Sequence, residues 1–231
     1  MKKPIMIAHR GYSGAYRENT ELAFIKAAEH LSGGAETDIR ITKDGIYVTH
    51  HNASADFEDG SSLVISESTF EELTAKPLFN NKTEDKVYIT TYKRYLEIMK
   101  ENNMICFVEL KGSFSDEQVK EIFGMADEIY DLKKVILQSF DFDNLIKAHG
   151  FFPEMPLMLT YGASEKNWER CFDYGFSIDI DQYVVTEEIV DEFHKRGLEV
   201  GVWTVNDEEN LKRIKAMNVN YIESDIFGGE K

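Results

Sequence analysis

Residues 5–11 read IMIAHRG, a short apolar run that leads directly into a histidine and an arginine. The run Ile5–Ala8 predicts a buried β-strand. A second predicted strand, Ala35–Ile41, carries Glu36 and Asp38, and strand residues at this spacing share one face. Two carboxylates on one face are costly unless a cation or a proton neutralises them. An imidazole, a guanidinium and this carboxylate pair at the ends of neighbouring strands indicate metal-assisted phosphate chemistry.

Strand-like and helix-like patterns alternate along most of the chain, which favours parallel βα units. Further strands are predicted at Ile46–Thr49, Ile105–Leu110, Val135–Leu137, Leu157–Thr160, Ser177–Ile180, Glu199–Thr204 and Tyr221–Ile222. Helices are predicted at Thr20–Leu31, Tyr92–Glu101, Ser115–Tyr130, Asp141–His149, Thr186–Arg196 and Asp207–Met217, with Ser115 and Asp141 as N-caps. A doubly wound sheet gives a similar alternation, but no Gly-rich phosphate loop follows the first strand. The pattern therefore predicts a TIM (β/α)8 barrel in one domain spanning residues 1–231.

The segment from about residue 52 to residue 86 interrupts this alternation. It is acidic and loop-like, with one helical signal at Ser68–Thr74, where Ser68 and Glu71 form a capping-box pattern. We expect a small insertion after the second barrel strand that lies over the mouth of the barrel.

Composition and charge narrow the possible functions. The chain has 231 residues and a formal net charge of -16, which disfavours a nucleic-acid partner or an anionic membrane. No signal peptide or membrane-spanning stretch is evident, so we expect a cytoplasmic protein without stable membrane association. Cys106 and Cys171 are too few and too far apart for a disulfide framework or a zinc site, and Cys106 reads as a small buried residue.

The third barrel strand adds Glu109 and Lys111 at its carboxyl end, where barrel active sites lie. Together with Glu36 and Asp38, Glu109 offers three carboxylates, which suit Mg²⁺ or Ca²⁺ better than zinc. In this reading, Arg10 and Lys111 hold the non-bridging oxygens of a phosphate.

The alternative is that these charges form solvated ion pairs, Glu109 with Lys111 and Glu36 with Arg40. Functional and structural charges look alike locally. Their joint placement at strand ends favours the functional interpretation.

Histidines supply the proton transfer that phosphate chemistry needs near neutral pH. His9 ends the first strand, and His50 and His51 end the short strand after the Lys43–Gly45 turn. Strand alternation lets only one of His50 and His51 face the site, and periodicity alone does not select it. His30, His149 and His194 read as ordinary surface or core histidines.

Several short motifs occur in order along the chain: His9-Arg10-Gly11, Arg17-Glu18-Asn19-Thr20, Glu36-Thr37-Asp38, Thr42-Lys43-Asp44-Gly45, His51-Asn52, Val108-Glu109-Leu110-Lys111, Gln138-Ser139-Phe140-Asp141 and Val202-Trp203-Thr204-Val205-Asn206. This series resembles the glycerophosphodiester phosphodiesterase family. That family has a strand ending His-Arg-Gly, a Pro-Glu-Asn-Thr segment, a Glu-x-Asp strand, a Thr-Lys-Asp-Gly turn and a strand ending His-Asp. A Ser-Phe segment and a Trp-Thr-x-Asn motif follow. The similarity spans nearly the whole chain, and the combination is highly specific.

The resemblance implies a TIM barrel with a small insertion after the second strand and a divalent cation, Mg²⁺ or Ca²⁺, on Glu36, Asp38 and Glu109. It implies His9 and His51 as the catalytic pair, and so selects His51 over His50. It also suggests that Trp203, with Phe140 as a weaker candidate, forms an apolar wall against a glycerol moiety.

Two positions depart from the family pattern. Arg17 stands in place of the usual proline, a change expected to alter loop stiffness. Asn52 stands in place of the aspartate after the catalytic histidine, which is expected to lower the basicity of that histidine or to loosen the surroundings of the cation.

The sequence thus predicts a metal-dependent enzyme that hydrolyses glycerophosphodiesters to glycerol 3-phosphate and an alcohol, with a small-molecule substrate. One alternative is a related barrel enzyme that cleaves phospholipid headgroups by cyclisation, which would need an apolar or basic rim facing the membrane. Another is a catalytically silent protein that binds phosphodiesters, and Asn52 is the feature that favours it.

Overall fold

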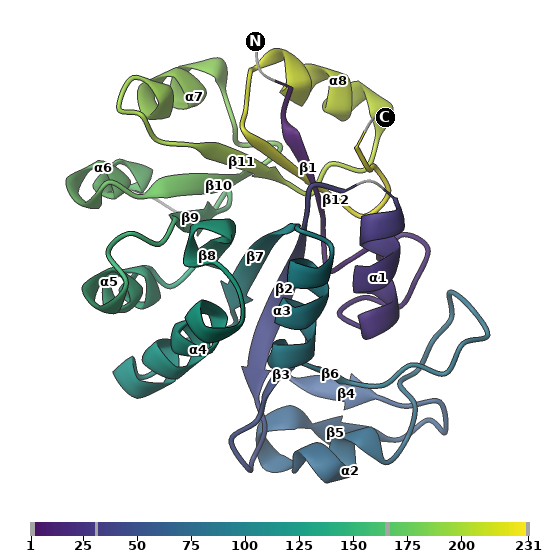
Figure 1. The fold of residues 1–231 in the computed structure, drawn as a ribbon. Coiled ribbons are helices and arrows are strands. Elements are labelled where there is room, and N and C mark those ends of the chain that lie inside the picture. Colours follow the sequence, from purple (N-terminus) through teal and green to yellow (C-terminus); the bar gives the residue numbers. More distant parts are fainter. Residues whose placement is uncertain (1–2, 31, 165–166, 230–231) are drawn as a thin grey trace.

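The computed structural model describes residues 3–30, 32–164 and 167–229. Parallel strands close into a barrel in the order β1-β12-β11-β10-β9-β8-β7-β2, and β2 pairs back to β1. The barrel strands are β1 (Ile5–Ala8), β2 (Gly34–Ile41), β7 (Ile105–Leu110), β8 (Val135–Ser139), β9 (Leu157–Tyr161), β10 (Ser177–Asp181), β11 (Val200–Trp203) and β12 (Tyr221–Ser224). Helices surround these strands (Figure 1). The chain is therefore a TIM barrel, as the alternating pattern predicts.

Each helix around the barrel except α6 (Cys171–Tyr174) begins after a residue whose side chain caps its first turn. The other helices are α1 (Glu21–Glu29), α3 (Tyr92–Glu101), α4 (Asp116–Ile129), α5 (Phe142–Phe151), α7 (Glu187–His194) and α8 (Glu208–Ala216), with short 3-10 turns η2 (Leu132–Lys134) and η3 (Trp168–Arg170). The side chains of Thr20, Ser115 and Asp141 each accept a backbone N–H from the first turn of a helix. The predicted caps Ser115 and Asp141 are thus confirmed. The predicted helix end at Leu31 lies outside the described residues.

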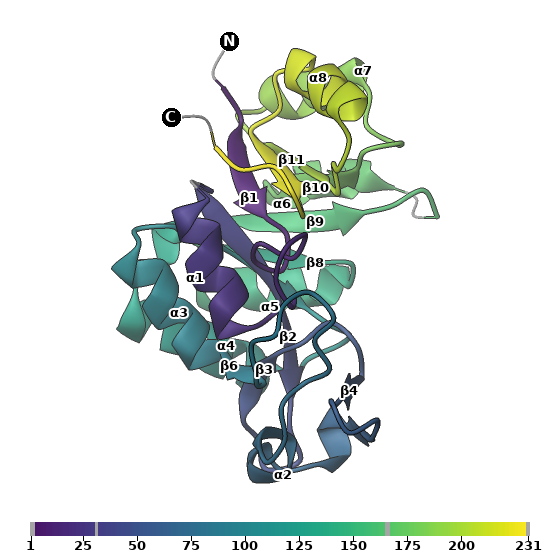
Figure 2. The same ribbon diagram turned by 90° about the vertical axis from the view of Figure 1, so that its right-hand side faces the viewer.

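The segment after β2 forms a separate small substructure. Strand β3 (Tyr47–Thr49) runs antiparallel to β2 and pairs with β6 (Thr90–Thr91), while β4 (Ser54–Asp56) and β5 (Ser62–Val64) form a hairpin. The turn η1 (Ile65–Glu67) and helix α2 (Phe70–Thr74) complete it. Phe57, Ile65, Leu73 and Leu78 are fully buried in a core of its own. Figures 1 and 2 place this substructure at the end of the barrel away from the termini.

The predicted capping box at Ser68 and Glu71 is wrong by one residue. Thr69 is the N-cap of α2, and Glu72 is its capping-box partner. Ser68 instead ends η1, where its N–H donates to the Ile65 carbonyl, and its own carbonyl accepts the Lys43 N–H. Because the backbone of Ser68 is engaged on both sides, the overlapping Thr-x-x-Glu pattern forms the cap.

The barrel interior is divided into an apolar layer and a polar layer. Ile7, Phe107, Ile136, Met158 and Tyr221 form a separate apolar cluster. On four of these strands, the residue two positions after the apolar one is polar, namely Glu109, Gln138, Thr160 and Glu223. Since alternate strand residues share a face, both layers point into the barrel. The polar layer lies nearer the carboxyl ends of the strands and forms the floor of the mouth.

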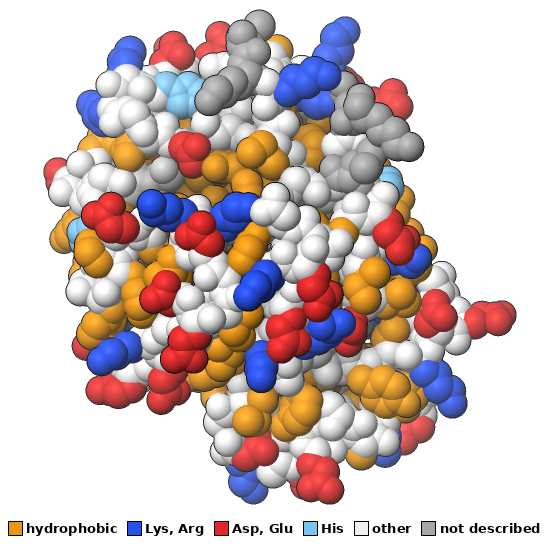
Figure 3. All heavy atoms as spheres, in the orientation of Figure 1, with side chains coloured by type: hydrophobic (Ala, Val, Ile, Leu, Met, Phe, Trp, Pro, Cys, Tyr) orange, Lys and Arg blue, Asp and Glu red, His pale blue; other side chains and the backbone are white. Residues whose placement is uncertain are grey.

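Three further features concern the cysteines, the surface charges and the lengths of the helices. Cys106 and Cys171 are buried free thiols. Acidic and basic side chains are interspersed on the face shown in Figure 3. Among the described residues, no helix has the length and apolarity needed to cross a membrane.

Candidate active site

The loop after β1 brings the first two candidate residues into the mouth of the barrel. Arg10 and Gly11 both have left-handed backbones, with φ of 56° and 77°. A Cβ on Gly11 would lie 2.8 Å from Ala23 of α1, so only glycine allows this close approach. The strained Arg10 backbone has a specific partner, because its N–H donates to Glu36 Oε2 over 2.8 Å. The loop is thereby fixed against the carboxylate on β2.

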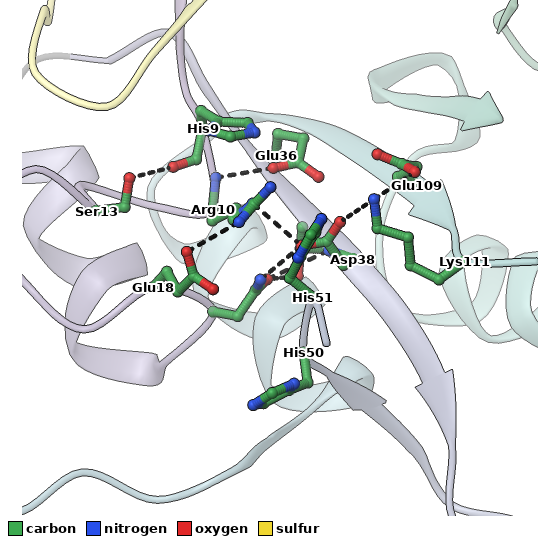
Figure 4. A network of polar contacts seen from close by, with 12 residues as sticks. His9, Arg10, Ser13, Glu18, Glu36, Asp38, His50, His51, Glu109 and Lys111 are labelled. Atoms are coloured by element: carbon green, nitrogen blue, oxygen red, sulfur yellow. Dashed lines mark hydrogen bonds and ion pairs between the residues drawn. The ribbon is translucent and has the colours of Figure 1, made fainter. Parts of the chain in front are cut away.

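Three carboxylates meet where β2 and β7 end (Figure 4). Oxygen atoms of Glu36, Asp38 and Glu109 all lie within 4.8 Å of one another. Glu36 and Asp38 are 2% and 1% exposed. Burial, followed by the charges of Asp38 and Glu223, raises the pKa of Glu36 well above its ordinary value. Burial likewise raises the pKa of Glu109. Glu36 and Glu109 therefore hold protons more readily than free carboxyl groups do, unless a cation replaces those protons.

Two cations lie against this group. Lys111 Nζ is 2.6 Å from Glu109 Oε1 and 3.0 Å from Asp38 Oδ1, and Arg10 Nε is 3.5 Å from Asp38 Oδ2. Burial alone would raise the pKa of Asp38, but Lys111 and Arg10 outweigh it and lower that pKa. The two basic side chains stay protonated, since the carboxylates outweigh burial and raise their pKa values.

The predicted alternative of solvated ion pairs does not describe these contacts. Glu36 is buried, and Arg40 donates from Nε to the carbonyl oxygen of His51 over 3.0 Å. The Lys111–Glu109 pair exists, but the side chains are only 16% and 13% exposed.

Asn19 holds Asp38 in place. Its amide Nδ2 donates to Asp38 Oδ2 over 2.7 Å, and its Oδ1 accepts both the Thr37 hydroxyl and the Asp38 N–H. Its own carbonyl accepts the Thr49 hydroxyl. This buried amide connects the loop after β1 to β2 and β3, and sequence reasoning had placed it only within a motif.

The two adjacent histidines do not continue a strand, contrary to the sequence interpretation. β3 ends at Thr49, and the next residues turn away because the His50 N–H donates to the Asp38 carbonyl. His50 is 3% exposed, with Nδ1 near the Asn52 carbonyl, while His51 faces the carboxylates (Figure 4). His51 Nδ1 lies 3.1 Å from Asn52 Oδ1. The turn brings the side chains of the neighbouring residues His51 and Asn52 into contact. Burial lowers the pKa of His51 and outweighs the influence of Asp38.

His9 has a partner that sequence reasoning missed. Its Nδ1 lies 2.7 Å from Asp225 Oδ1, which also accepts the Ser13 hydroxyl. Asp225 Oδ2 accepts the Asn206 amide over 2.6 Å. Burial raises the pKa of Asp225, but these hydrogen bonds, led by the one to His9, lower it to about 2. Asp225 directly follows β12, but the predicted strand ended at Ile222, so the sequence did not single out this residue.

A second acidic pair, also missed from the sequence, lies near the three carboxylates in the polar layer that contains Glu109. The Gln138 amide Nε2 donates to both Asp179 Oδ2 and Glu223 Oε1, over 2.7 and 2.6 Å. Burial, with nearby carboxylates, raises the pKa values of Asp179 and Glu223 well above ordinary. Gly201 leaves room for Asp179, since a Cβ there would lie 2.5 Å from Asp179 Oδ1. A further possible ligand group, His9 with Glu36 and Glu223, shares Glu36 with the first.

Trp203 lies at the carboxyl end of β11. Its indole N–H donates to the Asp179 carbonyl over 3.1 Å, and its ring packs edge-on against Phe140 with centroids 5.7 Å apart. Phe140 is 42% exposed. These aromatic rings follow β8 and β11, whereas the charged groups follow β1, β2 and β7.

Comparison with known proteins supports the fold and the family resemblance. Residues 9–227 match the model of the glycerophosphoryl diester phosphodiesterase family. The glycerophosphodiester phosphodiesterase of Caldanaerobacter subterraneus is 27% identical over 230 residues, covering 96% of this chain and 94% of that protein. The crystal structure of the Thermotoga maritima enzyme of the same name has a TM-score of 0.78 and 27% identity, covering 97% and 96% of the two chains. A phosphodiesterase of Oleispira antarctica, solved with the product sn-glycerol-3-phosphate, has a TM-score of 0.83 and 22% identity, covering 96% and 93%.

Proposed function

The chain belongs to the glycerophosphoryl diester phosphodiesterase family of phosphoric diester hydrolases, and from this premise we propose that it hydrolyses glycerophosphodiesters to glycerol 3-phosphate and an alcohol. The observation that carries the proposal is the gathering of Glu36, Asp38 and Glu109 between two cations and two histidines. The product named in the Oleispira antarctica complex agrees with this substrate class.

The carboxylate group fits a hard divalent cation. All three ligands offer oxygen, which Mg²⁺ and Ca²⁺ prefer. Within the described part of the chain, Glu36 Oε1 is buried and has no hydrogen-bond partner, an expensive arrangement for a carboxylate oxygen. A cation held by Glu36, Asp38 and Glu109 would satisfy that oxygen and would supply charge neutralisation and polarisation of the phosphate.

Arg10 and Lys111 are placed to bind the phosphate. Both remain protonated beside the carboxylates, and both are largely buried. Guanidinium and ammonium donors held in a partly desolvated site stabilise the additional negative charge that develops on phosphate oxygens in the transition state.

The partners of the two histidines favour a different role for each. The Asn52 amide oxygen only accepts hydrogen bonds, so the proton of neutral His51 sits on Nδ1 and Nε2 is free to accept a proton. Asp225 contacts His9 at Nδ1 and orients the ring, so Nε2 is the ring nitrogen available to exchange a proton with the substrate. We therefore assign His51 as the general base for the attacking hydroxyl and His9 as the general acid for the leaving alcohol.

The test is the release of glycerol 3-phosphate from a panel of glycerophospho-alcohols, with and without chelator. We expect release in the presence of Mg²⁺ or Ca²⁺, loss of release with EDTA, and recovery when the cation is restored. Binding of these compounds without any release would instead support a silent binding protein. Undiminished turnover after exhaustive chelation would contradict the metal dependence.

A further inference from the structure

A basic pocket opens beside His9, on the side away from the carboxylates. It has a volume of ≈ 450 Å³, within the range of small-molecule sites, and is lined by His9, Arg10, Arg17, Glu18, Lys82 and Asp225 among others. None of Glu36, Asp38 or Glu109 lines it. The pocket therefore lies next to the cleavage site and is distinct from the cation-binding group.

The charge of this pocket is unusual for so acidic a chain. Arg10, Arg17 and Lys82 face it, whereas the chain as a whole carries a formal charge of -16. Its two acidic residues are already engaged: Asp225 accepts from His9, Ser13 and Asn206, and Glu18 pairs with two arginines. The groups of the pocket that remain available to bind a ligand are therefore mainly positively charged donors.

Arg17 is the least satisfied of these cations. Its NH1 lies 3.5 Å from Glu18 Oε1, longer than the 3.0 Å between Arg10 NH1 and Glu18 Oε2. Its Nε is buried and has no hydrogen-bond partner among the described residues. A buried unpaired donor is costly, and a guanidinium matches the geometry of phosphate. This is also a position where the sequence departs from the family pattern, which has proline.

A chain of ion pairs connects the pocket with the carboxylate group of the proposed cleavage site. Arg10 touches Asp38 through Nε and Glu18 through NH1, and Glu18 reaches Arg17. On the other wall, Lys82 from the insertion reaches the Gly14 carbonyl in the loop after β1. A substrate whose scissile phosphate contacts Arg10 can therefore extend past His9 toward Arg17 and Lys82.

We propose that this pocket binds a second phosphate carried by the leaving alcohol, so that the preferred substrates are glycerophosphodiesters of phosphorylated alcohols. The inference rests on the proposed function. With glycerophosphoinositol 4-phosphate, water adds to the diester phosphorus and the bond from phosphorus to the inositol oxygen breaks. The products are glycerol 3-phosphate and inositol 4-phosphate, and His9 returns a proton to the departing oxygen.

The experiment compares kcat/KM for glycerophosphoinositol 4-phosphate with kcat/KM for glycerophosphoinositol, which differ by one phosphate. At low ionic strength we expect the phosphorylated compound to be preferred about tenfold, mainly through KM, the effect of one charge-assisted hydrogen bond. The ratio should fall about tenfold in Arg17→Gln and several-fold in Lys82→Met. The matched control is Lys76→Met, which removes a cation from the same insertion outside the pocket and should leave the ratio unchanged.

A wild-type ratio near one, or a ratio unchanged in Arg17→Gln, overturns the subsite while leaving the proposed function intact. If neither compound is hydrolysed, the proposed function fails, and calorimetric titration with the same two compounds decides the subsite alone. Tighter binding of the phosphorylated compound that is lost in Arg17→Gln would then support it, and equal binding would overturn it.

Discussion

Replacing Asn52 by aspartate tests the role assigned to His51. The variant restores the residue of the family pattern and places a carboxylate where an amide now contacts His51 Nδ1 over 3.1 Å. The positive form of His51 is stabilised by that new charge, so the pKa of this histidine should rise. Because the side chains of residues 51 and 52 are in contact, the new charge would act on the His51 ring at short range.

The size of the shift follows from the geometry. With charge spread over the ring and the carboxylate, the effective separation is about 4 Å, which gives about 1 kcal/mol in water and about 4 kcal/mol at an effective dielectric constant of about 20. His51 is only partly buried, so an intermediate of about 1.5–2.5 kcal/mol applies. At about 1.4 kcal/mol per pKa unit, the expected rise is about 1–2 units.

The assay is the pH dependence of kcat/KM with glycerophosphocholine at saturating cation concentration. A general base must be neutral to act, so the acidic limb of the profile should move to higher pH by about 1–2 units in Asn52→Asp. At high pH both proteins should agree within a few-fold. Asn103→Asp, at the opposite end of β7, makes the same chemical change far from the site and should not move the limb.

Superimposed profiles, or a downward shift, would refute this account of His51. A shift confined to the alkaline limb would show instead that His51 acts as the acid, and it would exchange the roles of the two histidines.

Three further outcomes are expected from the same geometry. His9→Ala and His51→Ala should each reduce kcat by about 10²–10⁴-fold, and circular dichroism should show that the fold is retained. His50→Ala should mainly lower the melting temperature, because His50 is buried outside the reacting group. Loss of activity in His50→Ala alone would contradict the assignment of His51 as the catalytic residue. The affinity for Ca²⁺, measured by calorimetric titration, should fall as the pH is lowered, because the raised pKa of Glu36 lets protons compete with the cation. Glu36→Gln should abolish Ca²⁺ binding. An affinity that does not depend on pH would count against Glu36 as a ligand. Asn19→Ala should weaken Ca²⁺ binding about 10–100-fold by releasing Asp38, and unchanged affinity would show that this amide does not position the ligand.

Elements with a strong local pattern were predictable from the sequence. Helix Tyr92–Glu101 and strand Ile105–Leu110 agree with the structure at both ends, because helical spacing and a continuous apolar run leave little ambiguity. The hairpin Ser54–Val64 was not predicted, since its strands are only three residues long, too short for an alternating pattern to be recognised. Its stability comes from burial of Ala55 and Phe57 against distant apolar residues, which no local pattern reveals.

The candidate site likewise contains residues that sequence patterns predicted and one contact that they could not reveal. Glu36, Asp38, Glu109 and Lys111 are brought together as predicted. Glu36 and Asp38 share one face of β2, Asp38 lies in register with Glu109 of the neighbouring β7, and Lys111 directly follows β7. The contact between His9 and Asp225 joins residues 216 positions apart. It becomes predictable only when β1 is known to pair with β12 in the register Ala8 to Ser224, because each residue directly follows one of these partners. Barrel closure, rather than any motif, makes this pair.

The buried acidic groups explain why the polar layer resists prediction. A barrel interior is ordinarily filled by apolar side chains, and five buried or nearly buried carboxylates cannot all ionise there. The surroundings stabilise these carboxyl groups in different ways. Asp38 keeps its charge beside Lys111 and Arg10, whereas Asp179 and Glu223 both accept a hydrogen bond from the Gln138 amide. Glu36 and Glu109 have raised pKa values. The charged state of Glu36 and Glu109 is therefore stabilised only when further positive charge enters the mouth. The alternation that builds the barrel also gathers these carboxylates near His9 and His51, where we propose that the cation binds and the chemistry occurs.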